Sequence, residues 1–392
     1  MIKKTRLLSL DVMRGITIAG MIMVNNPGNW GYVYTPLRHA SWNGLTPTDL
    51  VFPFFMFIMG VSMDFSLQKY GNELNRAALK KIITRTLVIF AIGLGIGWFS
   101  SVCSGIFNIG NTEQNVWQRF VGSVFPIHSI RILGVMQRLA LCYCGGALLS
   151  LVIRKKYFLW TAFLILLAYT IILFAGHGFV LAEDNIIGVI DRAVLGGNHM
   201  YHIKTPAGDW MPFDPEGLLS TLPCIPHVMF GMYVGRIIMN EKDNINRIGR
   251  IFVFGTILLF SGALLSYGIP VNKMIWSPTF VLVTCGLASL FLSLLIWIID
   301  MKHRVKWSRF FESFGINPLF MYVWGALMAI LIGNIRFWYN GSIISLKSYI
   351  YDQLLQPWLG NYPGSLAFAL LFVGFIWLFG YQLYKRRIYI KI

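Results

Sequence analysis

Apolar segments of about twenty residues recur along the whole chain, and shorter polar stretches separate them. Segments 158–175 and 366–379 contain no charged residue and no strongly polar face. About 20 apolar residues in a helix span a hydrocarbon core of roughly 30 Å. The pattern predicts an all-α polytopic membrane helix bundle that forms a single transmembrane domain over residues 1–392. About ten transmembrane helices are expected, at 7–25, 48–68, 84–103, 131–153, 157–176, 217–239, 250–268, 278–300, 316–334 and 365–384.

Composition agrees with this pattern. Only 12% of the 392 residues are charged, whereas 56% are hydrophobic. A soluble globular protein carries about 25% charged residues, so this chain has too few charges to cover a water-facing surface. A large soluble core of buried helices would also need polar faces on its outer helices. The composition therefore indicates that the chain is not a soluble globular protein and contains no separate soluble domain.

The positive charges are distributed by side rather than gathered in one patch. Most of the 33 lysines and arginines fall in short loops on one side of the predicted membrane, at 3–6, 69–85, 154–156, 236–250, 302–309 and 385–391. The opposite loops are longer and contain few basic residues. The positive-inside rule then predicts that both termini are cytoplasmic, which requires an even number of spans, in a bacterial inner membrane. The net charge of +17 is thereby explained without nucleic acid as a partner.

The N-terminal sequence MIKKTR, followed by an apolar run, resembles the start of a signal peptide. No small-residue cleavage site closes the run, and Asp11 and Arg14 lie inside it. We therefore expect a retained first helix. The five cysteines form no CxxC motif, and His199 and His202 lack a third ligand, so we predict neither a disulfide framework nor a metal site.

The most informative segment is 25–53, which joins the first two predicted helices on the outer face. An imidazole titrates near neutral pH, so His39 suits a general base for an amine or hydroxyl nucleophile. The side-chain amide of Asn25, at the end of the first helix, could donate to an oxyanion. The alternative for His39 is an ordinary interfacial histidine among tryptophans and tyrosines.

Several charged residues near or inside the spans have two interpretations. Asp49 follows Thr46 by three residues and Pro47 by two, which is typical of a helix cap, but it could also orient His39 or bind a substrate amine. Asp11 and Arg14 are spaced as an internal ion pair. Arg138 has no partner nearby in the sequence, so either a ligand phosphate or a distant carboxylate could pair with it.

Two further segments indicate polar groups at membrane depth. Asp214 and Glu216 precede a predicted helix and serve either as helix-start acids or as ligand contacts. Glycine, asparagine and proline in VNKMIWSP (271–278) and GINPLFMY (315–322) indicate interrupted helix ends, which are typical of a lined cavity.

These motifs together resemble the heparan-α-glucosaminide N-acetyltransferase family. The similarity is carried by RLLSLDVMRGITIAGMIMVNNPG (6–28), HASWNGLTPTDLVFPFFMFIMG (39–60), GVMQRLA, IDRAVLGGNHMY, DPEGLLSTLP, VNKMIWSP, GINPL and the C-terminal YKRRIYIKI. The motifs occur in order over nearly the whole chain. Lysosomal members carry an additional lumenal domain and N-terminal helix, so we expect this chain to be the short bacterial form.

The resemblance implies transfer of acetyl from cytosolic acetyl-CoA, as co-substrate, to the amine of a glucosamine-type sugar on the periplasmic side. The essential histidine of the family falls on His39, and its asparagine falls on Asn25, with Asn26 as the alternative because the loop differs in length. Matched positions with uncertain roles include Asp191 and Arg192. The predicted substrate-binding residues are Asp49, Trp42, Asn43, Glu216, His199, Lys273 and Trp276, and the predicted donor-binding residues are Arg138, Arg85, Asn317, Lys80 and Lys81.

Other functions share the same sequence features. A transporter for an amino sugar or muropeptide also needs many helices and interrupted motifs, although it often shows two similar halves that this chain lacks. An O-acetyltransferase of an envelope polysaccharide would use a hydroxyl acceptor in the same cavity. Direct transfer is expected over an acetyl-His39 intermediate. The resemblance also implies a possible homodimer in the lipid bilayer.

Overall fold

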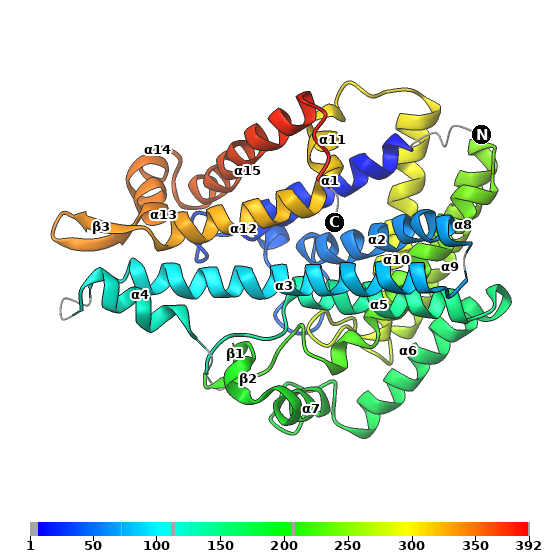
Figure 1. Ribbon diagram of the computed structural model, residues 1–392, viewed down its shortest axis with the longest axis horizontal. Helices are drawn as coiled ribbons and strands as arrows, with labels where there is room; N and C mark the ends of the chain where they lie inside the picture. The colour runs from blue at the N-terminus through cyan, green and yellow to red at the C-terminus, as the bar shows by residue number, and fades with distance from the viewer. Residues whose placement is uncertain (1–6, 72, 111–113, 127, 206–207, 391–392) are drawn as a thin grey trace.

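The computed structural model describes residues 7–71, 73–110, 114–126, 128–205 and 208–390. The predicted inner-side residues Lys3, Lys4, Arg6 and Lys391 lie outside these ranges. Within them the chain is an all-α helix bundle with two small β-hairpins, which confirms the predicted fold class (Figure 1).

Eight helical segments of the described chain are long and apolar enough to cross a membrane. A multi-pass membrane protein follows, as predicted. Their principal helices, some of them extended by a short turn at one end, are α2 (Val51–Leu67), α3 (Arg76–Ile106), α5 (Val135–Val152), α6 (Phe158–Ala175), α8 (Cys224–Asn240), α9 (Asn244–Leu265), α10 (Pro278–Leu295) and α15 (Asn361–Lys385).

The two remaining predicted spans are less regular. Helices α11 (Arg309–Ile316) and α12 (Pro318–Asn334) meet at a bend of 90° at Asn317, so the predicted 316–334 segment begins at a break. Helix α1 (Leu8–Val24) has 17 residues and is about 26 Å long. The described chain therefore has eight regular spans, nine if the bent pair is one span, and α1 as a shorter apolar helix beside them.

Some predicted boundaries were wrong because polar residues set the ends. Helix α3 begins at Arg76 rather than at 84, since the Asn75 side chain accepts a hydrogen bond from the Ala78 amide at 2.8 Å and caps the helix. Lys80 and Lys81 therefore lie on the helix and not in a loop. Helix α5 begins at Val135 rather than at 131, because the residues before it form polar contacts described below, whereas the span that contains α8 begins at Leu219, close to the predicted 217.

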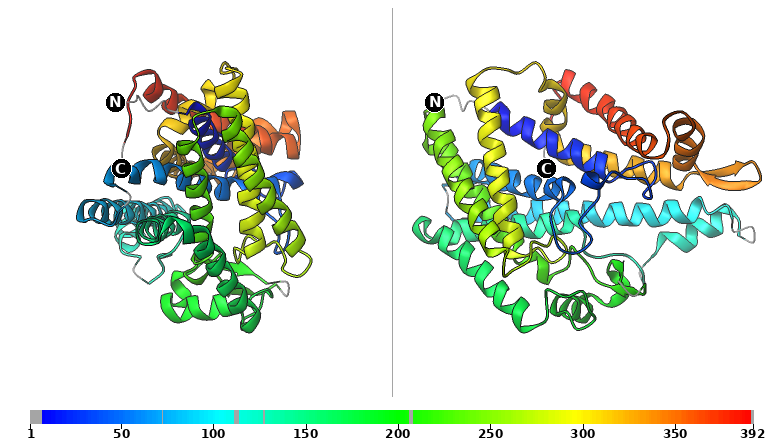
Figure 2. Two further views of the ribbon diagram at one scale, coloured as in Figure 1. Left: turned by 90° about the vertical axis from the view of Figure 1, so that its right-hand side faces the viewer. Right: turned by 180° about the vertical axis from the view of Figure 1, so that it is seen from behind.

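The predicted long loops contain short elements that apolar periodicity does not indicate. They are α4 (Val116–Val124), α7 (Ile186–Leu195), the antiparallel pair β1 (His202–Lys204) and β2 (Trp210–Pro212), the pair β3 (Arg336–Tyr339) and β4 (Ser342–Ser345), α13 (Leu346–Tyr349) and α14 (Gln356–Leu359). Helix α4 folds back along the end of α3, and the β3–β4 hairpin projects beyond α12, as the two views with the long axis horizontal show (Figure 1 and the right panel of Figure 2).

Helix α2 lies at the centre of the bundle, in contact with α1, α5, α8 and α10. Its crossing with α8 is very close. A Cβ atom on Gly60 would collide with the Val228 carbonyl, and one on Gly231 would collide with the Phe57 carbonyl. Only glycine fits at both positions, so the two backbones touch and fix α2 relative to α8.

Candidate active site

The residues before α2 form a compact polar turn around Asp49, whose side chain is fully buried. Its Oδ2 accepts backbone N–H groups from Ala40 and Thr46, each at 3.1 Å. Its Oδ1 lies 2.6 Å from His39 Nδ1. Asp49 therefore completes the capping box with Thr46 and also orients His39. The helix cap and the orienting partner of His39 that the sequence suggested are thus the same carboxylate.

The imidazole of His39 is 45% exposed in its side chain, whereas Asp49 is 1% exposed. A distance of 2.6 Å to a carboxylate oxygen requires a proton on Nδ1. The other ring nitrogen, Nε2, then carries the lone pair and can accept a proton. This arrangement gives His39 the geometry of an oriented general base.

A lysine from a distant loop completes this group. Lys273 Nζ lies 3.3 Å from Asp49 Oδ1 and 3.1 Å from His39 Nδ1. Burial lowers the pKa of Lys273, and the adjacent Asp49 carboxylate opposes that effect. Lys273 contacts the carboxylate and the imidazole, and its predicted role as a direct substrate contact stays a prediction.

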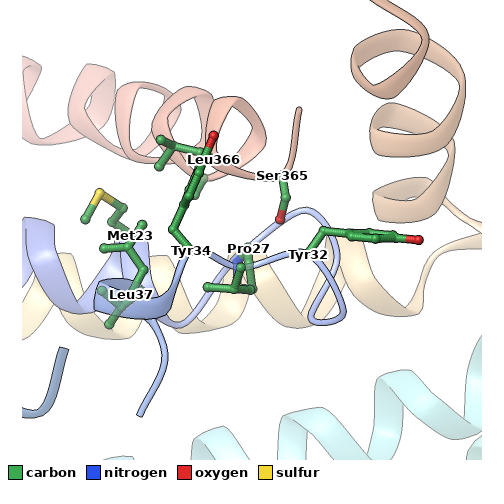
Figure 3. A pocket seen from close by; sticks show the side chains of 10 residues that line it. Met23, Pro27, Tyr32, Tyr34, Leu37, Ser365 and Leu366 are labelled. Carbon is green, nitrogen blue, oxygen red and sulfur yellow. The ribbon is translucent and has the colours of Figure 1, made fainter. Parts of the chain in front are cut away.

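The loop that carries His39 is anchored to the last helix. Gly28 N donates to the Ser365 carbonyl, and Asn29 N donates to Ser365 Oγ, each at 3.1 Å. Figure 3 shows Tyr32, Tyr34 and Leu37 of this loop around a small apolar pocket beside Ser365 and Leu366. The beginning of α15 therefore fixes the path of the chain from α1 to His39.

His39, Asn25, Glu216 and Lys273 line one pocket with about 510 Å³ of empty space, here named the His39 pocket. Asn25 caps α1 and is exposed, and its side chain makes no hydrogen bond within the described ranges. The amide of Asn26 instead donates to the Ile22 carbonyl at 2.8 Å. The geometry therefore favours Asn25 over Asn26 as a donor. The other lining residues are Met21, Val24, Thr48, Val51, Phe52, Val135 and Tyr322.

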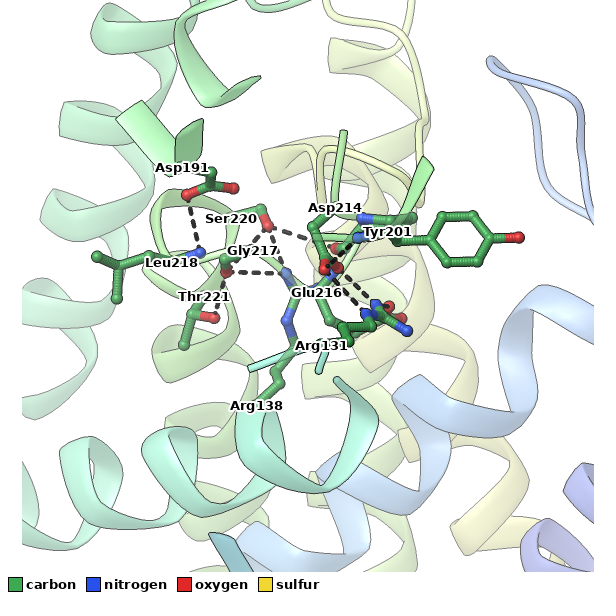
Figure 4. Close-up of polar contacts among 11 residues, drawn as sticks. Arg131, Arg138, Asp191, Tyr201, Asp214, Glu216, Gly217, Leu218, Ser220 and Thr221 are labelled. Atoms are coloured by element: carbon green, nitrogen blue, oxygen red, sulfur yellow. Dashed lines mark hydrogen bonds and ion pairs between the residues drawn. The ribbon is translucent and has the colours of Figure 1, made fainter. Parts of the chain in front are cut away.

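Glu216 enters the His39 pocket from the turn before α8, and Arg131, which belongs to none of the sequence motifs above, holds it there. Arg131 Nη2 lies 2.6 Å from Glu216 Oε2, and Arg131 Nε donates to Asp214 Oδ2 at 2.9 Å (Figure 4). Burial alone would lower the pKa of Arg131, but the two carboxylates raise it above its ordinary value. No residue near Arg131 in the sequence indicated this pairing, which spans more than eighty residues.

Arg138, on α5, is fully buried and stabilises the same turn before α8. Its guanidinium donates to the Gly217 carbonyl at 3.3 Å and to the Ser220 hydroxyl, and it lies 5.3 Å from the Trp276 ring (Figure 4). Asp191 Oδ1 accepts the Leu218 amide at 2.9 Å on the other side. Burial raises the pKa of Asp191 to about 6. Arg138 thus supports the backbone before α8, and its predicted contact with a donor phosphate stays a prediction.

Four other predicted residues support the loops around the pocket without lining it. Trp42 Nε1 donates to the Phe179 carbonyl at 2.9 Å, and Asn43 accepts from Asn272 at 3.1 Å. His199 Nδ1 lies 2.9 Å from the Ile130 carbonyl. Trp276 is 1% exposed. Their substrate contacts stay predictions.

A second pocket, with about 780 Å³ of empty space, lies further along helices α2, α5 and α12, which also line the His39 pocket. We name it the Arg85 pocket. Arg14 and Arg85 bring two guanidinium groups to it, and Arg85 lies 4.7 Å from the Tyr143 ring. Arg85 makes no ion pair within the described part of the chain. The remaining lining residues are Phe55, Met59, Ser62, Met63, Ile89, Leu139, Pro318 and Leu319.

The two pockets are separated by one helical turn on each of three helices. The His39 pocket is lined by Phe52 on α2, Val135 on α5 and Tyr322 on α12. The Arg85 pocket is lined by Phe55, Leu139 and Leu319, which lie three or four residues away on the same helices. Three or four residues of helix correspond to about 5 Å. A molecule in the Arg85 pocket would therefore end close to the base of the His39 pocket.

The remaining predicted donor residues lie outside both pockets. Lys80 and Lys81 are exposed on the first turns of α3, about one turn before Arg85. Asn317, at the bend between α11 and α12, donates to the Ile388 carbonyl and accepts the Ile390 amide, each at 2.8 Å. Within the described ranges, no three histidine, cysteine, aspartate or glutamate residues gather as a metal site would require.

Comparison with known proteins gives one consistent result. The family model for the catalytic region of heparan-alpha-glucosaminide N-acetyltransferase matches residues 6–269. The human heparan-alpha-glucosaminide N-acetyltransferase is 30% identical over 371 residues, covering 81% of this chain and 52% of the human protein. The mouse protein of the same name is 29% identical over 81% of this chain and 53% of its own length. The chain thus spans about half the length of the curated relatives it matches.

Proposed function

Because this chain belongs to the heparan-alpha-glucosaminide N-acetyltransferase family, we propose that it transfers acetyl from acetyl-CoA to the amine of a glucosamine-type sugar. The observation that carries the proposal is the pair of pockets one helical turn apart. The His39 pocket holds an oriented base, and the Arg85 pocket is lined by Arg85 and by Arg14, which forms an ion pair with Asp11 at 3.0 Å.

The donor would enter the Arg85 pocket. CoA carries several phosphates, which arginine binds well. Arg85 and the exposed Lys80 and Lys81 would hold these phosphates at the start of α3. The extended pantetheine arm would pass between α2, α5 and α12, so that the thioester carbon reaches the base of the His39 pocket.

The acceptor would enter the His39 pocket. Its amine nitrogen attacks the thioester carbonyl carbon while His39 Nε2 takes the proton that the nitrogen loses. The Asn25 amide donates to the carbonyl oxygen as negative charge develops there. The C–S bond then breaks, the proton returns to the CoA sulfur, and the products are the N-acetyl sugar and free CoA. One transfer suffices, so an acetyl-His39 intermediate is not needed.

Glu216 faces the same pocket and would contact the sugar. Its carboxylate forms an ion pair with Arg131 at 2.6 Å. A carboxylate favours the ammonium form of an amino sugar during binding. That ammonium releases one proton to solvent before the neutral amine attacks, and His39 takes the second proton as the amide forms. This supports an amine acceptor over the hydroxyl acceptor of an O-acetyltransferase.

We also propose that both termini are cytoplasmic and that the His39 pocket opens to the periplasm of a bacterial inner membrane. The basic residues near the ends of α2, α5, α8, α10 and α15 support this orientation. Cysteine accessibility at exposed Tyr267 and Lys81 tests it, because a membrane-impermeant reagent added outside should label only Tyr267→Cys.

The direct test of the activity uses purified protein with acetyl-CoA and glucosamine. We expect CoA thiol release in equal amount to N-acetylglucosamine. His39→Ala should abolish both, while acetyl-CoA binding persists. Sugar uptake into liposomes without thiol release would instead support the transporter alternative and contradict the proposal.

A further inference from the structure

Lys273 reaches the candidate active site from the loop between α9 and α10, and this loop is firmly attached to the loop that carries His39. Gly44 N donates to the Val271 carbonyl at 2.7 Å, and Asn272 donates to Asn43 at 3.1 Å. Asn272 N in turn donates to Ser277 Oγ at 2.9 Å. Lys273 is therefore held at a fixed position.

The distances around Asp49 fit an imidazole that carries its proton on Nδ1 beside a charged Lys273. An ammonium group has only donors, and Lys273 Nζ forms an ion pair with Asp49 Oδ1 at 3.3 Å. His39 Nδ1 also donates to Asp49 Oδ1, at 2.6 Å. The 3.1 Å between Lys273 Nζ and His39 Nδ1 then separates two donors and is not a hydrogen bond. Placing a cation beside Nδ1 disfavours a second positive charge on the imidazole.

Asp49 has the opposite effect on the imidazole, because a buried carboxylate stabilises imidazolium. With Lys273 present, the Asp49 charge is already paired, so the carboxylate orients His39 without holding it protonated. The other titratable groups that line the His39 pocket are Glu216, which is paired with Arg131, and Tyr322. The neighbouring Arg38 donates to the Val33 carbonyl at 2.8 Å and to the Gly31 carbonyl at 3.1 Å.

We propose that Lys273 is a positioning residue that compensates the charge of Asp49 and so keeps the His39 imidazole unprotonated and ready to act as the base. This inference rests on the proposed acetyl transfer. It also assigns a role to a residue that lies beyond the region matched by the family model. Lys273 acts through Asp49 and His39 and need not contact the sugar.

The test is the pH profile of kcat/KM for glucosamine in Lys273→Met, with the profile expressed as a ratio to wild type so that titration of the acceptor cancels. Without the ammonium, the acid limb should move to higher pH by about one unit, and activity should approach wild type on the alkaline side. Lys273→Arg keeps the charge, so its acid limb should stay at the wild-type position even if its rate falls.

Lys347→Met is the matched control. Lys347 is also a partly buried lysine, and its Nζ lies 5.9 Å from the Trp30 and Phe368 rings rather than beside a carboxylate. Its loss should leave the profile in place. A Lys273→Met profile that is uniformly lower, without a shift, would assign a merely structural role to Lys273. A raised KM with no shift would assign a sugar contact. Either result overturns the inference.

A second measurement is independent of acetyl transfer. Diethyl pyrocarbonate modifies the unprotonated imidazole, and peptide mass spectrometry reports its reaction with His39 as a function of pH. The modification curve should move to higher pH in Lys273→Met and stay in place in Lys273→Arg. If wild type transfers no acetyl but this shift occurs, the proposed function fails and the charge compensation stands. If the modification curve of Lys273→Met stays at the wild-type position, the inference fails.

Discussion

His39 Nδ1 lies 2.6 Å from Asp49 Oδ1, and Asp49 is itself held by the backbone amides of Ala40 and Thr46. The same carboxylate therefore caps the turn before α2 and fixes the orientation of the imidazole. Local folding and the orientation of the base depend on one side chain.

Asp49→Asn should lower kcat by about a hundredfold or more, because an amide can leave His39 in the wrong tautomer. The asparagine oxygen can still accept the backbone amides, so the melting temperature should fall by only a few degrees. Thermal unfolding and kcat are measured on the same preparation. A variant with normal kcat would show that His39 needs no partner on Nδ1.

Asn25→Ala should lower kcat by about a hundredfold if its amide donates to the developing oxyanion. Asn26→Ala is the matched control, because the Asn26 amide is already bonded to the Ile22 carbonyl within α1. It should retain most of the activity. Equal losses in the two variants would indicate that neither amide acts on the thioester oxygen.

Asp191 predicts a pH dependence of stability. Burial raises its pKa from 3.8 to about 6, so the folded protein favours the protonated carboxyl. The buried charge therefore destabilises the fold above pH 6, and this penalty disappears as pH falls from 6 to 4. The melting temperature of Asp191→Asn relative to wild type should be higher at pH 7.5 than at pH 4.5.

The control for this effect is Asp209→Asn, an exposed aspartate beside β2. Its melting temperature relative to wild type should not vary between the two pH values. A constant difference for Asp191→Asn as well would show that the Asp191 charge has no cost in the folded protein.

The close crossing of α2 and α8 predicts that alanine destabilises the protein at Gly231 but not at Gly374, a glycine of α15 outside the crossing. Gly231→Ala places a Cβ against the Phe57 carbonyl, so the helices must separate and stability should fall by about 1–3 kcal/mol. A Cβ on Gly374 of α15 meets no atom within 4 Å. Gly374→Ala should be neutral or stabilise slightly, since alanine favours helix. Equal melting temperatures would contradict the close contact.

The sequence predicted those features that neighbouring residues in the chain determine. Asp49 follows His39 by ten residues, and its capping position could be read from Thr46 and Pro47. The apolar runs located the eight regular spans of the described chain, the bent pair α11 and α12, and the shorter helix α1, which was predicted as a full span. The 90° bend at Asn317 agrees with the interrupted GINPL motif.

Contacts between distant segments could not be predicted in the same way. Lys273 meets His39 across 234 residues, and Arg131 meets Asp214 across 83. Side-chain type alone does not say which loop lies next to which, because several cations and carboxylates could pair equally well. The short elements of the long loops were missed because they contain too few residues to show a period.

The central claim is that the two adjoining pockets pass acetyl from a donor on one membrane face to an acceptor on the other. The most direct measurement uses proteoliposomes of one orientation, with acetyl-CoA on the side of Lys81 and glucosamine only on the side of His39. We predict N-acetylglucosamine on the His39 side, equal in amount to CoA released on the Lys81 side, and none with His39→Ala. Acetylation only when both substrates share one side would contradict the account.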